Sequence, residues 1–103
     1  MAKVIIEVNA LVKKELIGRM VLSEAGHDKG DLYIIIGEYS KDSVLLVNGS
    51  TKTTKKPKLK KFKHLSLTDV LDEEIQKSIH EKDKNLDLII KRFLKLNGNV
   101  KEG

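Results

Sequence analysis

The chain has 103 residues, no cysteine and a formal net charge of +5. A chain of this length forms one domain with a modest core, and the lack of cysteine excludes disulfide frameworks, thiolate metal sites and cysteine nucleophiles. Its N-terminal sequence has no apolar run long enough for a signal peptide or a membrane span, so we expect a cytoplasmic protein.

The first fifteen residues fit two different structures. The stretch KVIIEV has the composition of a strand, whereas NALVKKEL has a cap at Asn9 and helical spacing through Leu11, Val12 and Leu16. Both interpretations stay open for residues 1–15.

Residues 16–66 contain a series of short strands separated by tight turns. IGRMVLS and LYIIIGEY have strand composition and are joined by the polar turn EAGHDKGD. SVLLVNGSTKT follows as a hairpin, in which Asn48-Gly49 is the pair best suited to a type I′ turn. Strands at a spacing of about ten residues predict a small antiparallel barrel.

The polar turn between the first two strands has glycines at both ends. We expect a positive φ or a close backbone approach at Gly26 and Gly30, and we expect Asp28 to cap the backbone of its own turn. For Lys29 and His27, contact with a phosphate and simple exposure to solvent both stay open.

The excess positive charge is concentrated in residues 51–64. This segment has seven lysines and no acidic residue, whereas the stretches before and after it each carry one more acidic than basic side chain. We expect Pro57 to favour an extended segment, anchored by Leu59, Phe62 and Leu65 with the ammonium groups outward. Such concentrated charge indicates a polyanionic partner, and nucleic acid is the usual one.

The last third of the chain changes to helical spacing. Apolar residues recur every four positions over residues 71–79, and a second apolar stripe covers residues 86–94. We therefore predict two amphipathic helices within residues 67–98, packed on the barrel or on each other, followed by a tail at 99–103.

Polar residues mark the ends of both predicted helices. Thr68 or Ser66 can cap the first helix, and Asn85 or Asp83 can cap the second. Gly98 can end the second helix.

We expect no catalytic site, no metal site and no cofactor. The three histidines, His27, His64 and His80, lack the spacing of metal ligands. No nucleophile elbow surrounds Ser23, and GHDKG lacks the length and the Lys-Ser/Thr ending of a phosphate-binding loop.

One ordered set of motifs covers about half of the chain. Its members are Gly18-Arg19, Ser23-x-Ala25-Gly26-x-Asp28-Lys29-Gly30, the apolar run 33–36, VLLVNG at 44–49 and KKPKLKKFKHL at 55–65. Their order and spacing resemble the KOW-motif family, most closely the ribosomal-protein-fourteen type of eukaryotes and archaea and its small bacterial RNA-binding relatives. The chain departs from the family at His27, where the family usually has arginine, and in lacking an arginine after Asn48-Gly49.

With the two C-terminal helices predicted from the helical spacing, we expect a mainly β fold with α. The resemblance implies that an SH3-like β-barrel precedes these helices. It also implies a non-catalytic RNA-binding protein, ribosomal or ribosome-associated, that contacts the phosphate backbone through a lysine-rich barrel surface. The expected partners are RNA, ribosomal RNA first, and ribosomal proteins, with no membrane and no small-molecule substrate. The alternative is an SH3-like protein–protein interaction module of the transcription or translation machinery.

The candidate RNA-binding residues are basic side chains of the barrel and of the segment that follows the hairpin. They are Arg19, His27, Lys29, Lys52, Lys55, Lys56, Lys58, Lys60, Lys61, Lys63 and His64.

Overall fold

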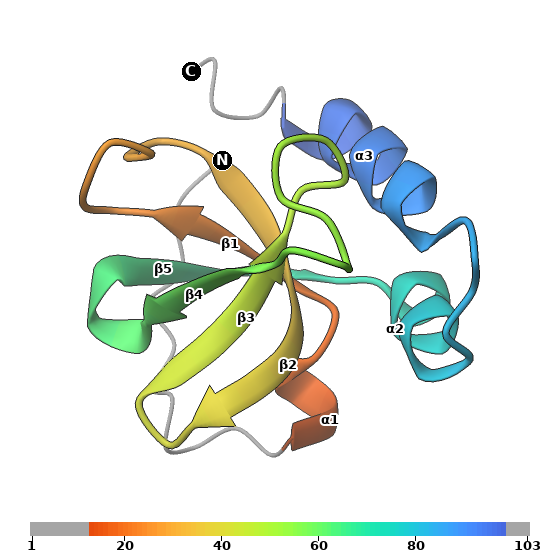
Figure 1. Ribbon diagram of the computed structural model, residues 1–103, viewed down its shortest axis with the longest axis horizontal. Helices are drawn as coiled ribbons and strands as arrows, with labels where there is room; N and C mark the ends of the chain where they lie inside the picture. The colour runs from red at the N-terminus through yellow and green to blue at the C-terminus, as the bar shows by residue number, and fades with distance from the viewer. Residues whose placement is uncertain (1–12, 99–103) are drawn as a thin grey trace.

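Five strands form one antiparallel sheet in the computed structural model, which describes residues 13–98 (Figure 1). The elements are α1 (Lys13–Leu16), β1 (Arg19–Ser23), β2 (Leu32–Ser40), β3 (Ser43–Val47), β4 (Lys58–Lys61), the 3₁₀ helix η2 (Phe62–His64), β5 (Leu65–Leu71), α2 (Glu73–His80) and α3 (Leu86–Asn97). Residues 1–12 and the predicted tail at 99–103 lie outside the described residues. Where the first fifteen residues are described, they enter the helix α1.

The strand order is β4-β3-β2-β1-β5, so β4 and β5 are the two edge strands. The sheet curves strongly (Figure 1), but among the described residues no hydrogen-bonded pairing joins β4 to β5. The predicted mixture of antiparallel strands and two C-terminal helices is therefore confirmed as an open sheet with helices.

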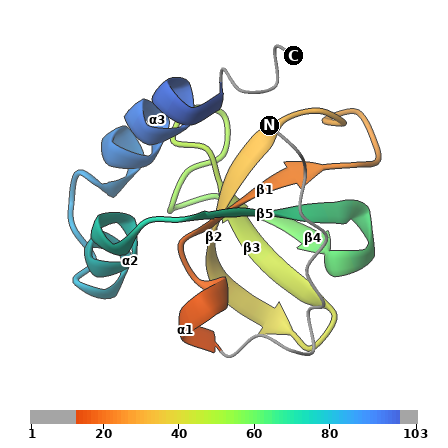
Figure 2. The ribbon, with the colours of Figure 1, turned by 180° about the vertical axis from the view of Figure 1, so that it is seen from behind.

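The two faces of the sheet carry separate apolar clusters, because successive side chains of a strand point to opposite faces. The inner cluster receives side chains from α1 and from the strands β1, β2, β3 and β5. Its buried members are Leu16, Val21, Tyr33, Ile35, Val44, Leu46, Leu65 and Leu67. The outer cluster lies between the sheet and the helices α2 and α3, which share one side of the sheet (Figure 2); its buried members are Met20, Ile34, Val47, Ile75, Leu86, Ile90 and Leu94. Each fully buried aliphatic side chain contributes about 1.5–3 kcal/mol to folding.

The hairpin predicted within SVLLVNGSTKT is wrong, because its second arm at residues 50–53 lies in a loop and Asn48-Gly49 does not join two strands in a type I′ turn. β3 and β4 pair in antiparallel register, with Leu45 opposite Leu59, across a long loop at residues 48–57. A type I′ turn needs a positive φ at both central residues. Of Asn48 and Gly49, only Gly49 has a positive φ. The side-chain oxygen of Asn48 instead accepts hydrogen bonds from the backbone amides of Ser50 and Lys52, each at 2.9 Å, and thereby opens the turn into a loop.

The start of the first C-terminal helix was also predicted wrongly. Residues 66–71 belong to β5, which pairs with β1 and buries Leu65 and Leu67 in the inner cluster. Thr68 is no cap, because its hydroxyl donates to the carbonyl of Met20 at 2.7 Å. The N-cap of α2 is Asp72, whose carboxylate accepts from the amides of residues 74 and 75.

The second predicted helix forms as α3, with Asn85 at the N-cap position and Gly98 at the C-cap position. The side chain of Asn85 makes no capping hydrogen bond, and the Asp83 carboxylate accepts from the Asn85 amide at 2.7 Å instead. No helix among residues 13–98 has the length and the apolar character needed to cross a membrane.

The loop at residues 48–57 rests directly on α3. Both carboxylate oxygens of Asp87 accept hydrogen bonds from Thr54, one from its amide at 2.9 Å and one from its hydroxyl at 3.0 Å. A Cβ at Gly49 would lie 2.1 Å from the carbonyl oxygen of Asp87 and 2.8 Å from the amide nitrogen of Lys91. The backbone of the loop therefore packs against the backbone of the helix without space for a side chain.

Replacing Gly49 by alanine should destabilise the fold more than the same change at Gly30. Both glycines have positive φ, 82° and 95°, and either change costs about 1–2 kcal/mol in backbone strain. A Cβ at Gly30 meets nothing within 4 Å, whereas Gly49→Ala adds a clash with α3 of about 1–3 kcal/mol. Urea unfolding of both variants measures the difference, and equal losses would contradict close packing of the loop on α3.

Candidate nucleic-acid interface

Two of the three lysines of β4, Lys58 and Lys60, have the reverse of the expected orientation. Lys60 and Lys58 pair with Val44 and Leu46, two members of the inner cluster, so the two lysines point to the inner side of the sheet. Leu59 points the other way and is 49% exposed, so its predicted role as an anchor is wrong. The other two expected anchors do pack on the inner cluster: Leu65 is buried in it and Phe62 lies partly buried against it.

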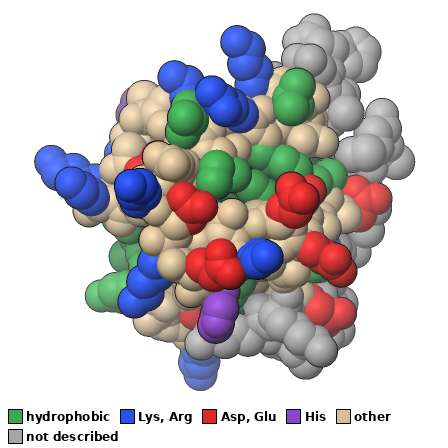
Figure 3. Space-filling model, turned by 90° about the vertical axis from the view of Figure 1, so that its right-hand side faces the viewer, with side chains coloured by type: hydrophobic (Ala, Val, Ile, Leu, Met, Phe, Trp, Pro, Cys, Tyr) green, Lys and Arg blue, Asp and Glu red, His purple; other side chains and the backbone are tan. Residues whose placement is uncertain are grey.

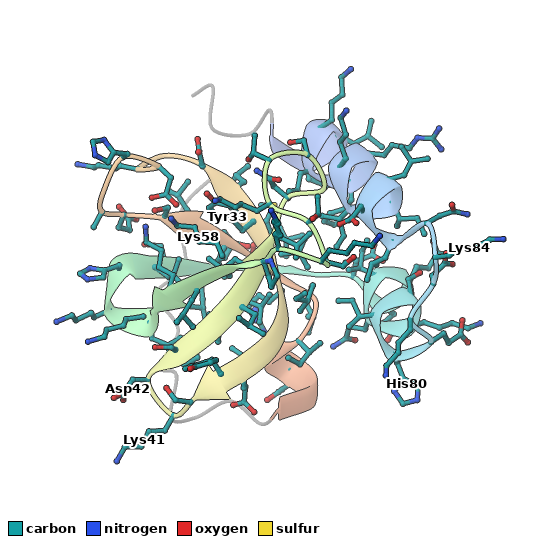
Figure 4. All side chains as sticks on the ribbon, viewed as in Figure 1. Tyr33, Lys41, Asp42, Lys58, His80 and Lys84 are labelled. Atoms are coloured by element: carbon teal, nitrogen blue, oxygen red, sulfur yellow. The ribbon has the colours of Figure 1, made fainter. Side chains whose placement is uncertain are left out.

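The inward lysines meet the carboxylate of Asp28 in the turn between β1 and β2. The ammonium of Lys60 lies 2.6 Å from Asp28 Oδ1 and donates to the carbonyl of Ala25 at 2.8 Å, while the ammonium of Lys58 lies 3.7 Å from Asp28 Oδ2. The hydroxyls of Ser23 and Tyr33 donate to the same carboxylate at 2.9 and 2.8 Å. Figure 4 shows Tyr33 and Lys58 close together over the sheet.

Asp28 is therefore the centre of a network of tertiary contacts, and the prediction that it caps its own turn is wrong. The side chains of Asp28 and Lys60 are only 13% and 9% exposed. Burial disfavours the charged carboxylate, but hydrogen bonds from Lys60, Tyr33 and Ser23 and the charge of Lys58 outweigh it and hold the pKa of Asp28 well below its usual range. Burial of the phenol and its contact with this carboxylate raise the pKa of Tyr33.

Arg19, like Asp28, makes contacts that hold separate segments of the fold together. Its side chain is buried, and its guanidinium donates to two carbonyls, that of Glu15 at 2.9 Å and that of Thr68 at 2.8 Å. It joins the end of α1 to β5. Arg19 is one of the candidate RNA-binding residues, but the structure places its side chain inside the fold.

The remaining candidates fall into two groups. The first, which we call the corner surface, consists of His27, Lys29, Lys61, Lys63 and His64. The second comprises Lys52, Lys55 and Lys56 in the loop that rests on α3.

The corner surface brings the turn at residues 24–31 beside η2, at the end of the sheet shown on the left of Figure 1. The amide of Glu24 donates to the carbonyl of His64 at 2.8 Å, and the contacts of Lys60 with Ala25 and Asp28 tie the same two segments together. An open hollow of about 360 Å³ lies beside β4 and is lined by Lys58, Leu59, Lys60, Lys61, Lys63 and His64.

The exposed lysines of the segment 51–64 are free of acidic partners. Of its seven lysines, Lys58 and Lys60 pair with Asp28, and none of the other five forms an ion pair within residues 13–98. Lys55, Lys56, Lys61 and Lys63 are exposed, and Lys52 is partly exposed. The concentration of charge seen in the sequence is therefore present on the surface, reduced by the two lysines that Asp28 engages.

Within the described ranges, no three His, Cys, Asp or Glu side chains gather where they could hold a metal ion. A scan against protein-family models and a search of curated proteins found no match to the chain.

The network around Asp28 should make stability depend on pH in the acid range. The folded-state pKa of Asp28 is lowered, so its stabilising contribution is fully present above the unfolded value of about 4 and is lost as the pH falls below it. The free energy of unfolding of the natural protein, measured by urea denaturation from pH 6 to 2, should therefore fall more steeply than that of Asp28→Asn. Parallel curves for the two proteins would contradict the assigned network.

Proposed function

We propose that this protein is a non-catalytic RNA-binding protein that contacts the phosphate backbone through the exposed lysines of residues 51–64 and the rest of the corner surface. The observation that carries the proposal is the set of five lysines in this segment without an acidic partner in residues 13–98. Unpaired like charges repel one another and oppose folding. A polyanion removes this repulsion and gains entropy from the counterions that it releases.

The chemistry of the surface favours recognition of backbone and shape over recognition of base sequence. A lysine ammonium is a flexible point charge, whereas bidentate reading of a base edge is typical of arginine and of amide side chains. No arginine occurs in residues 51–64. Backbone contacts fix position on the nucleic acid without reading sequence, and double-stranded RNA is commonly recognised by its shape.

The proposal extends to the family and its setting. We propose that the curved sheet is the SH3-like barrel of a KOW-motif protein, ribosomal or ribosome-associated and cytoplasmic, with ribosomal RNA and neighbouring ribosomal proteins as partners. Three features support it: the ordered motifs in residues 18–65, the three-residue helix η2 that joins the two edge strands, and the inner cluster shared by four strands.

A titration of RNA binding against salt tests the function. The probe is a structured RNA hairpin of arbitrary sequence, and log K should fall linearly with log salt by about 0.7–0.9 for each phosphate contacted. Replacing Lys55, Lys56, Lys61 and Lys63 together by glutamine should lower this slope by about 3, because up to four contacts are lost.

The matched control replaces four other exposed lysines by glutamine, namely Lys41, Lys77, Lys82 and Lys84. It removes the same charge and should leave the slope close to that of the natural protein. If both quadruple variants change the slope equally, the lysine segment is not the binding site. If the natural protein shows no salt-dependent binding, the proposed function is wrong.

A further inference from the structure

We propose that α3 and the loop at residues 48–57 form a second phosphate-binding surface, which we call the loop–helix surface. This inference rests on the proposed function and extends the RNA contacts from the lysine segment onto the C-terminal helix. The basic residues of the loop–helix surface are Lys52, Lys55, Lys56, Lys91, Arg92 and Lys95.

The loop and the helix are held together as one surface. Thr54 gives both its amide and its hydroxyl hydrogen to the Asp87 carboxylate, and the loop at Gly49 packs against the backbone of α3. The backbone segments that carry the loop and helix cations are therefore held together in the free protein. A preformed surface of this kind loses less conformational entropy on binding than flexible side chains on separate segments.

The helix carries positive charge that its own acidic residue does not neutralise. α3 has three basic residues, Lys91, Arg92 and Lys95, all exposed, and one acidic residue, Asp87. Lys91 follows Asp87 by four positions, a spacing at which helical ion pairs commonly form. Both carboxylate oxygens of Asp87 bind Thr54 instead, and none of the three cations forms an ion pair within the described residues.

The net charge of the C-terminal part of the sequence gives no sign of this basic surface. Residues 65–103 have one more acidic than basic residue, but the two signs separate in space. Acidic residues gather at the start of α2, at Asp72, Glu73 and Glu74. Figure 3 shows a group of Lys and Arg side chains along the upper part of this side of the molecule, and the Asp and Glu side chains mainly below that group, where some further Lys and Arg side chains also lie.

A groove between the loop and α3 is the place where this surface would bind a nucleotide. It is an open hollow of about 520 Å³, and its lining includes Lys91, Lys95, Ser50, Thr51, Asn48, Leu32, Leu94 and Asp31. The hydroxyl oxygen of Thr51 accepts from the side-chain amide of Asn48 at 3.0 Å, which leaves the Thr51 hydroxyl hydrogen able to donate. Ammonium and hydroxyl donors are the groups that contact phosphate oxygens and sugars, and the partly buried Leu32 offers some apolar surface beside them.

The two basic surfaces lie at different ends of the fold. The corner surface is at the left of Figure 1, whereas α3 and the loop beside it lie at the upper centre and right. One protein can therefore contact two backbone tracts of a folded RNA. This arrangement points to structured RNA as the partner and not to a single extended strand along one groove.

The test removes the two lysines of the groove, Lys91 and Lys95, by the double change to glutamine. Binding to the same RNA hairpin is titrated against salt and compared with the double variant Lys41→Gln, Lys77→Gln, which removes equal charge from exposed positions. Lys41 lies at the turn between β2 and β3, at the opposite end of the molecule from α3 (Figure 4). Circular dichroism confirms that each variant is folded.

We expect the slope of the groove variant to fall by about 1.4–1.8, since two contacts are lost. Each contact contributes a factor of about 5 to 8 at 0.1 M salt, so the affinity there should fall by about 25- to 60-fold. A groove variant that matches the control, while the natural protein binds RNA with a steep salt dependence, would overturn this inference and leave the proposed function standing. Absence of binding by the natural protein would overturn the proposed function itself.

Discussion

The ion pair between Lys60 and Asp28 is the contact on which the arrangement of the basic surface depends. It joins the turn after β1 to the edge strand β4, across 32 residues of sequence, at an Nζ–Oδ1 distance of 2.6 Å. Because side chains alternate along a strand, fixing Lys60 inward also fixes Leu59 and Lys61 outward. The pair and the register of Lys60 opposite Val44 together set which lysines of the strand remain on the surface and which become part of the fold.

The same contact explains how the fold accommodates an edge strand made of lysines. β4 is four residues long, and three of its residues are lysine. Short edge strands with charged and inward-pointing residues resist pairing with the edges of other molecules. The two inward charges would be costly without a partner, and Asp28 supplies one that Ser23 and Tyr33 orient. The lysine-rich segment is therefore adapted to the fold as well as to a polyanionic partner.

Sequence reasoning succeeds here where local pattern decides the structure. β1, β2, β3 and α3 follow from strand composition, polar turns and helical spacing that can be read within ten residues or so. It fails where a residue far away in the sequence determines the structure of a segment. The stretch LSLTDVL alternates like a strand, but Ser66 and Thr68 are also residues that commonly cap a helix. The pairing with β1, which makes this stretch a strand, cannot be read from the stretch itself.

The candidate site shows the same division. The excess of lysine in one segment is visible in composition, but the inward orientation of Lys60 depends on its register with Val44. The burial of Arg19 depends on carbonyls of Glu15 and Thr68 that the fold brings to it. The free charge of α3 escapes a count along the chain because acidic residues near the start of α2 cancel it in sequence but not in space.

The most direct test of the account observes each lysine ammonium by NMR while a structured RNA hairpin is added. The account predicts that the signals of Lys61, Lys63, Lys55 and Lys56 shift together with RNA concentration. The Lys60 signal should stay in place because its ammonium keeps its contact with Asp28. A shift of Lys60 on the same binding curve, with the exposed lysines unchanged, would contradict the assignment of structural and RNA-binding lysines.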